Sequence, residues 1–77
     1  MLTSLEYDLR KYLLESKWVG RSFRTLCDSE VFTITGVIVD RRRGKAGRRM
    51  DRLVDDYGSI WFISEMESPG IVEVDNE

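Results

Sequence analysis

The sequence predicts an α+β fold, in which an N-terminal amphipathic helix packs on a small, curled, five-stranded antiparallel barrel. Before Gly20, apolar residues recur at the spacing of a helix. After Gly20, short alternating segments rich in β-branched residues are separated by turn residues, which is typical of strands. A chain of 77 residues has the size of one domain. We therefore expect a single domain over residues 1–77.

The helix is predicted over about residues 4–16. Thr3 and Glu6 have the spacing of a capping box, in which each side chain bonds the backbone amide of the other residue. An apolar stripe follows and predicts the buried face. The stripe consists of Leu5, Leu9, Tyr12 and Leu13. Tyr7, Leu14 and Trp18 lie off it, so either the helix is buried on two sides, which we favour, or these three meet a partner.

Five strands are predicted, at residues 22–27, 30–40, 52–55, 60–64 and 71–74. Gly36 lies within the longest of them and predicts a bulge or sharp bend. Both faces of the fourth segment are apolar, which favours a central strand. We expect five residues to be largely buried: Leu9, Phe32, Ile34, Ile38 and Trp61.

Residues 18–74 resemble the Src-homology-3-like small barrels, the family that includes Tudor-type and KOW-type modules. The resemblance rests on the strand order, on Gly36 in the long strand and on the ending Ser68-Pro69-Gly70-Ile71-Val72. It implies a five-stranded barrel but no ligand, because the chain has neither an aromatic peptide-binding set nor an aromatic cage. An oligonucleotide-type barrel is the alternative, although that fold usually needs more residues and a helix between strands three and four.

The residue types argue against catalysis. The chain contains no histidine, which removes the commonest general base and metal ligand. Cys27 has no histidine to activate it, so we expect an inert, half-buried strand cysteine. Asp51, Asp55 and Asp56 are better explained by turn chemistry and solvation than by a metal or acid–base site, because adjacent strand residues point to opposite faces. We expect no enzyme activity, no metal, no cofactor and no small-molecule substrate.

Cysteine content and hydropathy indicate the compartment. A single cysteine excludes an internal disulfide and fits a reducing environment. The first 16 residues carry five charges and the longest apolar run has four residues, so neither a signal peptide nor a membrane span is expected. We expect a cytoplasmic, independent accessory protein of the kind common in bacteria and their phages.

Positive charge is concentrated in residues 41–52, predicted to be a hairpin loop. This segment holds seven of the twelve basic residues and one acid, while the rest of the chain carries five basic and thirteen acidic residues. Arginine pairs bidentately with phosphate or carboxylate. The segment therefore predicts binding to nucleic acid or to an acidic protein surface, with an ordinary surface loop as the third possibility. The candidate residues are Arg41, Arg42, Arg43, Lys45, Arg48, Arg49 and Arg52.

No basic residue follows Arg52, whereas seven acids do, two of them in an acidic tail at 75–77. An alternative function is a phage-type inhibitor of a host protein, such as RNA polymerase or a nucleoid protein, acting by DNA mimicry. A third possibility is a structural or homo-oligomeric protein that uses an exposed strand edge. The alternative binding face comprises Tyr7, Leu14, Trp18, Asp55, Asp56, Glu65 and Glu67.

Overall fold

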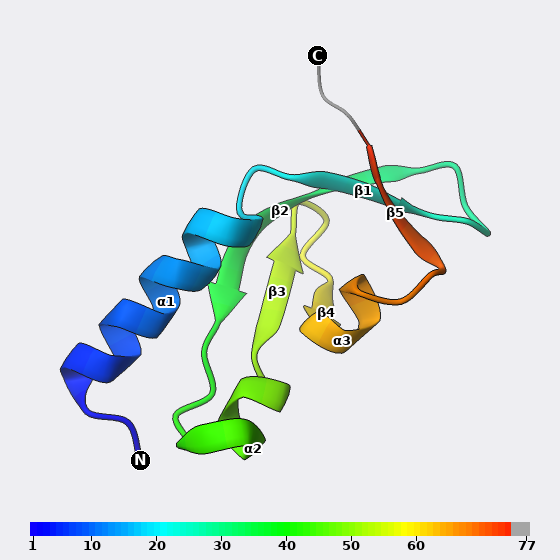
Figure 1. Ribbon diagram of the computed structural model, residues 1–77. Coiled ribbons are helices and arrows are strands. Elements are labelled where there is room, and N and C mark those ends of the chain that lie inside the picture. The colour runs from blue at the N-terminus through cyan, green and yellow to red at the C-terminus, as the bar shows by residue number, and fades with distance from the viewer. Residues whose placement is uncertain (75–77) are drawn as a thin grey trace.

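The computed structural model describes residues 1–74 and shows an α+β protein (Figure 1). Along the chain come a helix, two strands, a short helix, two strands, a helical turn and a last strand. Their bounds are α1 Ser4–Trp18, β1 Ser22–Thr25, β2 Val31–Ile38, α2 Gly44–Arg49, β3 Arg52–Asp55, β4 Ile60–Phe62, α3 Ile63–Met66 and β5 Ile71–Val74. The acidic tail expected at 75–77 lies outside the described residues.

Helix α1 begins with the predicted capping box. The Thr3 amide donates to Glu6 Oε1, and the Glu6 amide donates to Thr3 Oγ1, both at 3.2 Å. The two bonds satisfy amides that the first helical turn would otherwise leave unpaired. The helix continues to Trp18, two residues beyond the predicted end, because Trp18 is buried in the core and holds the last turn on the body.

The five strands form one antiparallel sheet in the order β4-β3-β2-β1-β5. Strand β2 is central, and β4 lies at an edge, so the prediction of a central fourth strand was wrong. Its apolar residues instead pack against the core, since Trp61 stacks on Phe32 with ring centroids 4.8 Å apart. No pairing between β4 and β5 closes the sheet within residues 1–74.

The fourth predicted strand ends early. Ile63 and Ser64, expected in a strand, begin the helical turn α3. Glu65 Oε1 accepts a hydrogen bond of 3.0 Å from the Phe62 amide and so stabilises the start of this turn. A local hydrogen bond from the backbone to the Glu65 side chain therefore competes successfully with the apolar run that indicated a strand.

The core lies between the sheet, the end of α1 and α3. It contains Trp18, Phe23, Phe32, Ile34, Leu53 and Met66. Burial of Phe32 and Ile34 was predicted and is confirmed, whereas Trp61 is only half-buried. The prediction for Leu9 was wrong, because its side chain is 58% exposed.

Strand β2 contains the predicted bulge. Its register against β3 shifts between Ile34 and Gly36. An extra residue in one strand reverses which side chains face the core beyond it. Accordingly Val37 packs against the core and Val39 is buried, whereas Ile38, expected inside, is half-buried.

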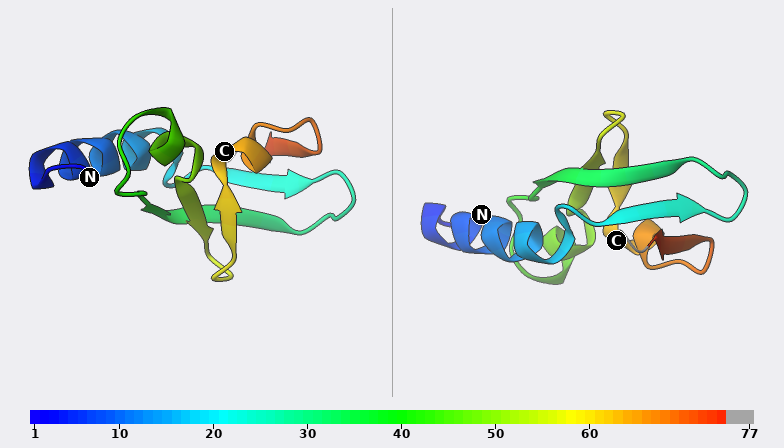
Figure 2. Two further views of the ribbon diagram at one scale, coloured as in Figure 1. Left: turned by 90° about the horizontal axis from the view of Figure 1, so that it is seen from below. Right: turned by 90° about the horizontal axis from the view of Figure 1, so that it is seen from above.

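The molecule is elongated, with extents of 40 × 23 × 18 Å. Figure 2 shows α1 at one end and the turn between β1 and β2 at the opposite end. Helix α1 packs against β2, and α2 lies below the sheet in Figure 1, near the N-terminal end of α1. Among the described residues, no helix is long and apolar enough to cross a membrane.

Candidate binding site on helix α2

The basic segment is not the loop that its glycines predicted, because Gly44–Arg49 forms helix α2. Glycine normally disfavours a helix. Here Gly47 is buried, and a Cβ on it would collide with the backbone carbonyl of Arg42. The close approach of α2 to the preceding chain therefore requires glycine at this position.

A buried ion pair fixes this segment to the body. Arg10 Nε and Nη2 donate to the two carboxylate oxygens of Asp51 at 2.8–3.0 Å. The Asp51 and Arg10 side chains are only 3% and 13% exposed. The Asp40 amide also donates to Asp51 at 2.8 Å, and Arg10 Nη1 donates to the Arg42 carbonyl at 3.3 Å. Arg10 and Asp51 thus join α1, the start of the basic segment and β3.

Three of the seven candidate cations contact their own chain. Arg42 makes a bidentate pair with Asp40 at 2.9 and 3.0 Å. Arg43 donates to the Met1 carbonyl and to Glu6 Oε1, both at 2.9 Å. The Arg41 guanidinium lies 4.4 Å from the ring centroid of Tyr7. The side-chain hydrogen bond from Arg42 is the main cause that lowers the pKa of Asp40 to about 2.

A fourth candidate, Arg52, belongs to β3 and is half-buried. Its Nε is buried, without a hydrogen-bond partner in the described part of the chain. Arg52 is therefore held within the sheet rather than presented on a loop, and the prediction of a freely splayed set of seven cations was wrong.

Three cations are free. Lys45, Arg48 and Arg49 are exposed, and within residues 1–74 they have no hydrogen-bonded or ionic side-chain partner. We call these three residues the α2 basic patch. They line a hollow of about 510 Å³ together with Ile63, Ser64 and Glu67 at α3. Arg48 also borders a second hollow of about 400 Å³, between α2 and α1.

The structure separates the members of the alternative binding face. Trp18 is core, Leu14 packs against the core, and Tyr7 lies under Arg41. These three residues therefore pack on the body, as the sequence favoured, but the predicted burial of the helix on two sides was wrong, because the stripe expected to be its buried face is exposed. The stripe consists of Leu5, Leu9, Tyr12 and Leu13. Asp56 lies on the exposed β3–β4 turn, and Glu65 and Glu67 belong to α3 and its end.

Asp55 is also not available on the surface. It is 4% exposed and accepts hydrogen bonds from the amides of Tyr57 and Ser59 and from Trp61 Nε1, at 2.8–2.9 Å. The prediction that Asp55 hydrogen-bonds the turn is confirmed, whereas the prediction that it is solvated was wrong. The burial of Asp55 was not predicted, although the sequence contains a signal for it. An aspartate is followed by a Gly-containing turn and a tryptophan, and these supply the donors that a buried carboxylate needs.

Cys27 is exposed in the turn after β1, not half-buried in a strand as predicted. In the described part of the chain, His, Cys, Asp and Glu residues form no cluster that could hold a metal ion.

Comparison with protein families, with curated proteins and with solved structures finds no match to this chain.

Proposed function

We propose that this chain is a small, non-enzymatic regulatory or accessory protein that engages nucleic acid, or a nucleic-acid-handling protein, through the α2 basic patch. The observation that carries the proposal is the division of the seven clustered cations. Four of them are held by their own chain: Arg41, Arg42 and Arg43 through side-chain contacts, and Arg52 within β3. The other three lie close together on one short helix and have no such contact in the described part of the chain. They are Lys45, Arg48 and Arg49. A fold that retains three unpaired neighbouring cations leaves them for an external anion.

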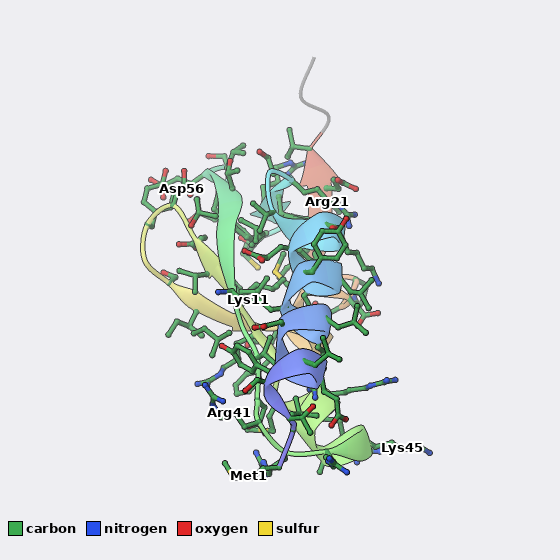
Figure 3. All side chains as sticks on the ribbon, turned by 90° about the vertical axis from the view of Figure 1, so that its left-hand side faces the viewer. Met1, Lys11, Arg21, Arg41, Lys45 and Asp56 are labelled. Carbon is green, nitrogen blue, oxygen red and sulfur yellow. The ribbon has the colours of Figure 1, made fainter. Side chains whose placement is uncertain are left out.

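The placement of the opposite charge supports an anionic partner. In Figure 3, Lys45 and Arg41 lie beside the N-terminal end of α1, and Asp56 lies near the other end of the molecule. Asp28 and Glu30 are also far from α2, at the β1–β2 turn. A charge separation of this kind orients a small protein in the field of a polyanion, with the α2 patch foremost.

The identity of the cations favours phosphate over a single carboxylate. Arginine forks bind phosphate oxygens in pairs, and lysine adds a mobile point charge. Glu67 borders the hollow between α2 and α3, so it opposes deep entry of an anion there. We therefore propose contact with the backbone of a nucleic acid along the outer side of α2, without base-specific readout.

The test is the salt dependence of binding to a fluorescent duplex DNA, followed by anisotropy. Three phosphate contacts predict a slope of log affinity against log salt of about −2.7. Replacement of Lys45, Arg48 and Arg49 by alanine should abolish binding, because it removes every free cation of the patch.

A matched control removes the same charge elsewhere. Lys11, Lys17 and Arg24 are also exposed but lie on α1 and β1. Their triple alanine variant should keep the slope and most of the affinity. Equal loss of binding in both triple variants would mean that net charge alone matters, and the site on α2 would be wrong.

The second candidate function is inhibition of a host protein by the acidic end of the molecule. Asp28 and Glu30 border a hollow of about 370 Å³ that is also lined by Tyr57 and Trp61. An aromatic, acid-rimmed hollow suits a basic protein surface. In this case the α2 variant would still capture its partner, and duplex DNA would not compete.

We also propose that the sheet is of the Src-homology-3-like type. The strand order β4-β3-β2-β1-β5 and the bulge at Gly36 support this. The single cysteine supports a reducing, cytoplasmic location.

A further inference from the structure

A hollow of about 370 Å³ lies between the β1–β2 turn and the β3–β4 turn. Figure 2 shows these two turns projecting from the sheet in different directions. The lining of the hollow combines the aromatic rings of Tyr57 and Trp61 with the carboxylates of Asp28 and Glu30. It is the hollow on which the second candidate function rests, and its chemistry points to a ligand that does not depend on the α2 basic patch.

The ring of Trp61 is held at this hollow by two contacts. Its indole is stacked on Phe32, with ring centroids 4.8 Å apart and ring planes 6° apart. Its Nε1 donates to Asp55 Oδ2 at 2.9 Å. Trp61 is nevertheless only half-buried, and Tyr57 on the same hollow is 65% exposed. Aromatic rings with free surface attract a cation, and tryptophan does so most strongly.

The charged groups that line the hollow are all negative. Glu30 and Asp28 are exposed and have no ionic partner within residues 1–74, although Asp28 accepts a hydrogen bond of 3.0 Å from the Glu30 amide. No lysine or arginine of the described chain lines the hollow. Arg24 is adjacent to Thr25, which does line it, so the Arg24 side chain leaves the opposite face of β1. The hollow therefore attracts a cation and repels a phosphate.

Among biological cations, a guanidinium group suits this lining best. It is flat and weakly hydrated, it stacks on aromatic rings, and its fork pairs with a carboxylate. An ammonium group has neither a flat face nor a fork. Free arginine carries a carboxylate of its own, which Asp28 and Glu30 would repel, whereas an arginine within a polypeptide does not.

We propose that this hollow binds an arginine side chain presented by a basic segment of another protein. The guanidinium group stacks on the exposed surface of Trp61 and Tyr57 and pairs with Glu30. Asp56 is exposed on the same turn as Tyr57, and Asp28 lies on the other turn. Further basic residues of the segment would therefore meet a carboxylate on either side of the hollow.

Binding is tested by NMR, with isotope-labelled protein and a capped peptide that carries one arginine among glycines. The Trp61 indole Nε1–H signal should shift, with a Kd on the order of 1 mM for a single anchoring side chain. A peptide with citrulline in place of arginine is the matched ligand, because citrulline has nearly the same shape and no charge. The citrulline peptide and free arginine should both bind at least about fivefold more weakly.

Two variants test the lining, each with a matched control on α1. Tyr57→Ala should weaken binding of the arginine peptide about fivefold to tenfold, while the Tyr57 amide keeps its 2.9 Å bond to Asp55 and the turn remains formed. Tyr12→Ala should change nothing, since Tyr12 is equally exposed, at 65%, but lies on α1. Glu30→Gln should weaken binding about twofold to fivefold, and Glu15→Gln should have no effect.

Four results of these titrations would overturn the proposal. They are an unshifted Trp61 signal at about 10 mM peptide, equal binding of the arginine and citrulline peptides, equal effects of Tyr57→Ala and Tyr12→Ala, and free arginine that binds as tightly as the peptide. The last result would assign the hollow to a small molecule.

A second copy of the chain is tested as an occupant by sedimentation equilibrium without peptide. A mass of 9.0 kDa is expected. A higher mass that returns to 9.0 kDa in Tyr57→Ala would mean that cations of another copy fill the hollow, and it would overturn a foreign partner. The alanine variant of the α2 basic patch should bind the peptide like the wild type, so failure here is separate from failure of the function proposed for α2.

Discussion

At the scale of single residues, two buried carboxylates organise the part of the chain that was predicted to be solvated. Asp51 and Asp55 are 2% and 4% exposed, and each accepts at least three hydrogen bonds. A buried charge is tolerated only when it is paired or fully hydrogen-bonded. Asp55 meets this need within one turn, whereas Asp51 meets it through Arg10, 41 residues away.

The Arg10–Asp51 pair leads to a prediction for stability. Asp51→Ala should destabilise the fold by about 3–5 kcal/mol, because the Arg10 guanidinium would remain buried without its partner. This is a large fraction of the total stability of a small domain. Urea denaturation followed by tryptophan fluorescence measures the change.

The exposed pair Arg21–Glu73 provides the control. Its side chains are 36% and 46% exposed, and its atoms are 2.8 Å apart. Glu73→Gln should cost only about 0–1 kcal/mol, since solvent screens this pair. Similar costs for the two substitutions would contradict the buried, structural role of Asp51.

The lowered pKa of Asp40 predicts how its contribution to stability depends on pH. Its pKa is lowered from 3.8 to about 2, first by the side-chain hydrogen bond from Arg42. A carboxyl group with a depressed pKa contributes stability above its ordinary value and loses it as the pH falls towards the lowered value. The contribution of Asp40 should therefore be complete above pH 4 and should disappear between about pH 4 and pH 2.

The measurement is an NMR titration of the Asp40 carboxyl carbon in the wild type and in Arg42→Ala. The midpoint should move from about 2 towards 3.8 in the variant. An unchanged midpoint would show that Arg42 does not hold this carboxylate.

At the scale of elements, α2 shows how a long-range contact overrides local propensity. Its six residues include two glycines, and a sequence of that kind indicates a loop. The helix forms because Gly47 allows the backbone to pass close to the Arg42 carbonyl, which Arg10 also contacts. The absence of a side chain is therefore the feature that permits this packing.

Gly47→Ala tests that explanation by its sign. In an exposed helix the change would stabilise by up to about 1 kcal/mol. Here the added methyl group meets backbone that cannot move aside freely, so we expect a loss of about 1–3 kcal/mol. Ala46→Gly, at an exposed neighbouring position, should cost about 1 kcal/mol through propensity alone. Chemical denaturation measures the stability of both variants. If Gly47→Ala stabilised the protein, the backbone at position 47 would not lie close to the Arg42 carbonyl.

Strand β2 is the element for which local chemistry was most informative. Its β-branched residues predicted a strand and Gly36 predicted the bulge, and both are confirmed. The bulge reverses the alternation beyond it, so a pattern that placed Ile38 inside and Val37 outside was correct only up to Ile34.

At the scale of the whole molecule, the elongated shape separates three surfaces. The α2 basic patch lies below the sheet in Figure 1, the β1–β2 and β3–β4 turns lie away from it, and the exposed apolar face of α1 points away from the sheet.

The sequence by itself determined what local interactions control. The Thr3–Glu6 capping box, the strand at β2 and the bulge at Gly36 depend on neighbours within a few residues, so their signals are complete in the chain. It could not determine which side of α1 is buried, because both sides are apolar and the choice is made by Trp18 in the core. It also could not determine which cations are free, because Arg10 and Arg43 find their acidic partners 41 and 37 residues away. Only the tertiary structure brings such groups together, and it therefore decided which side of α1 is exposed and which cations are free.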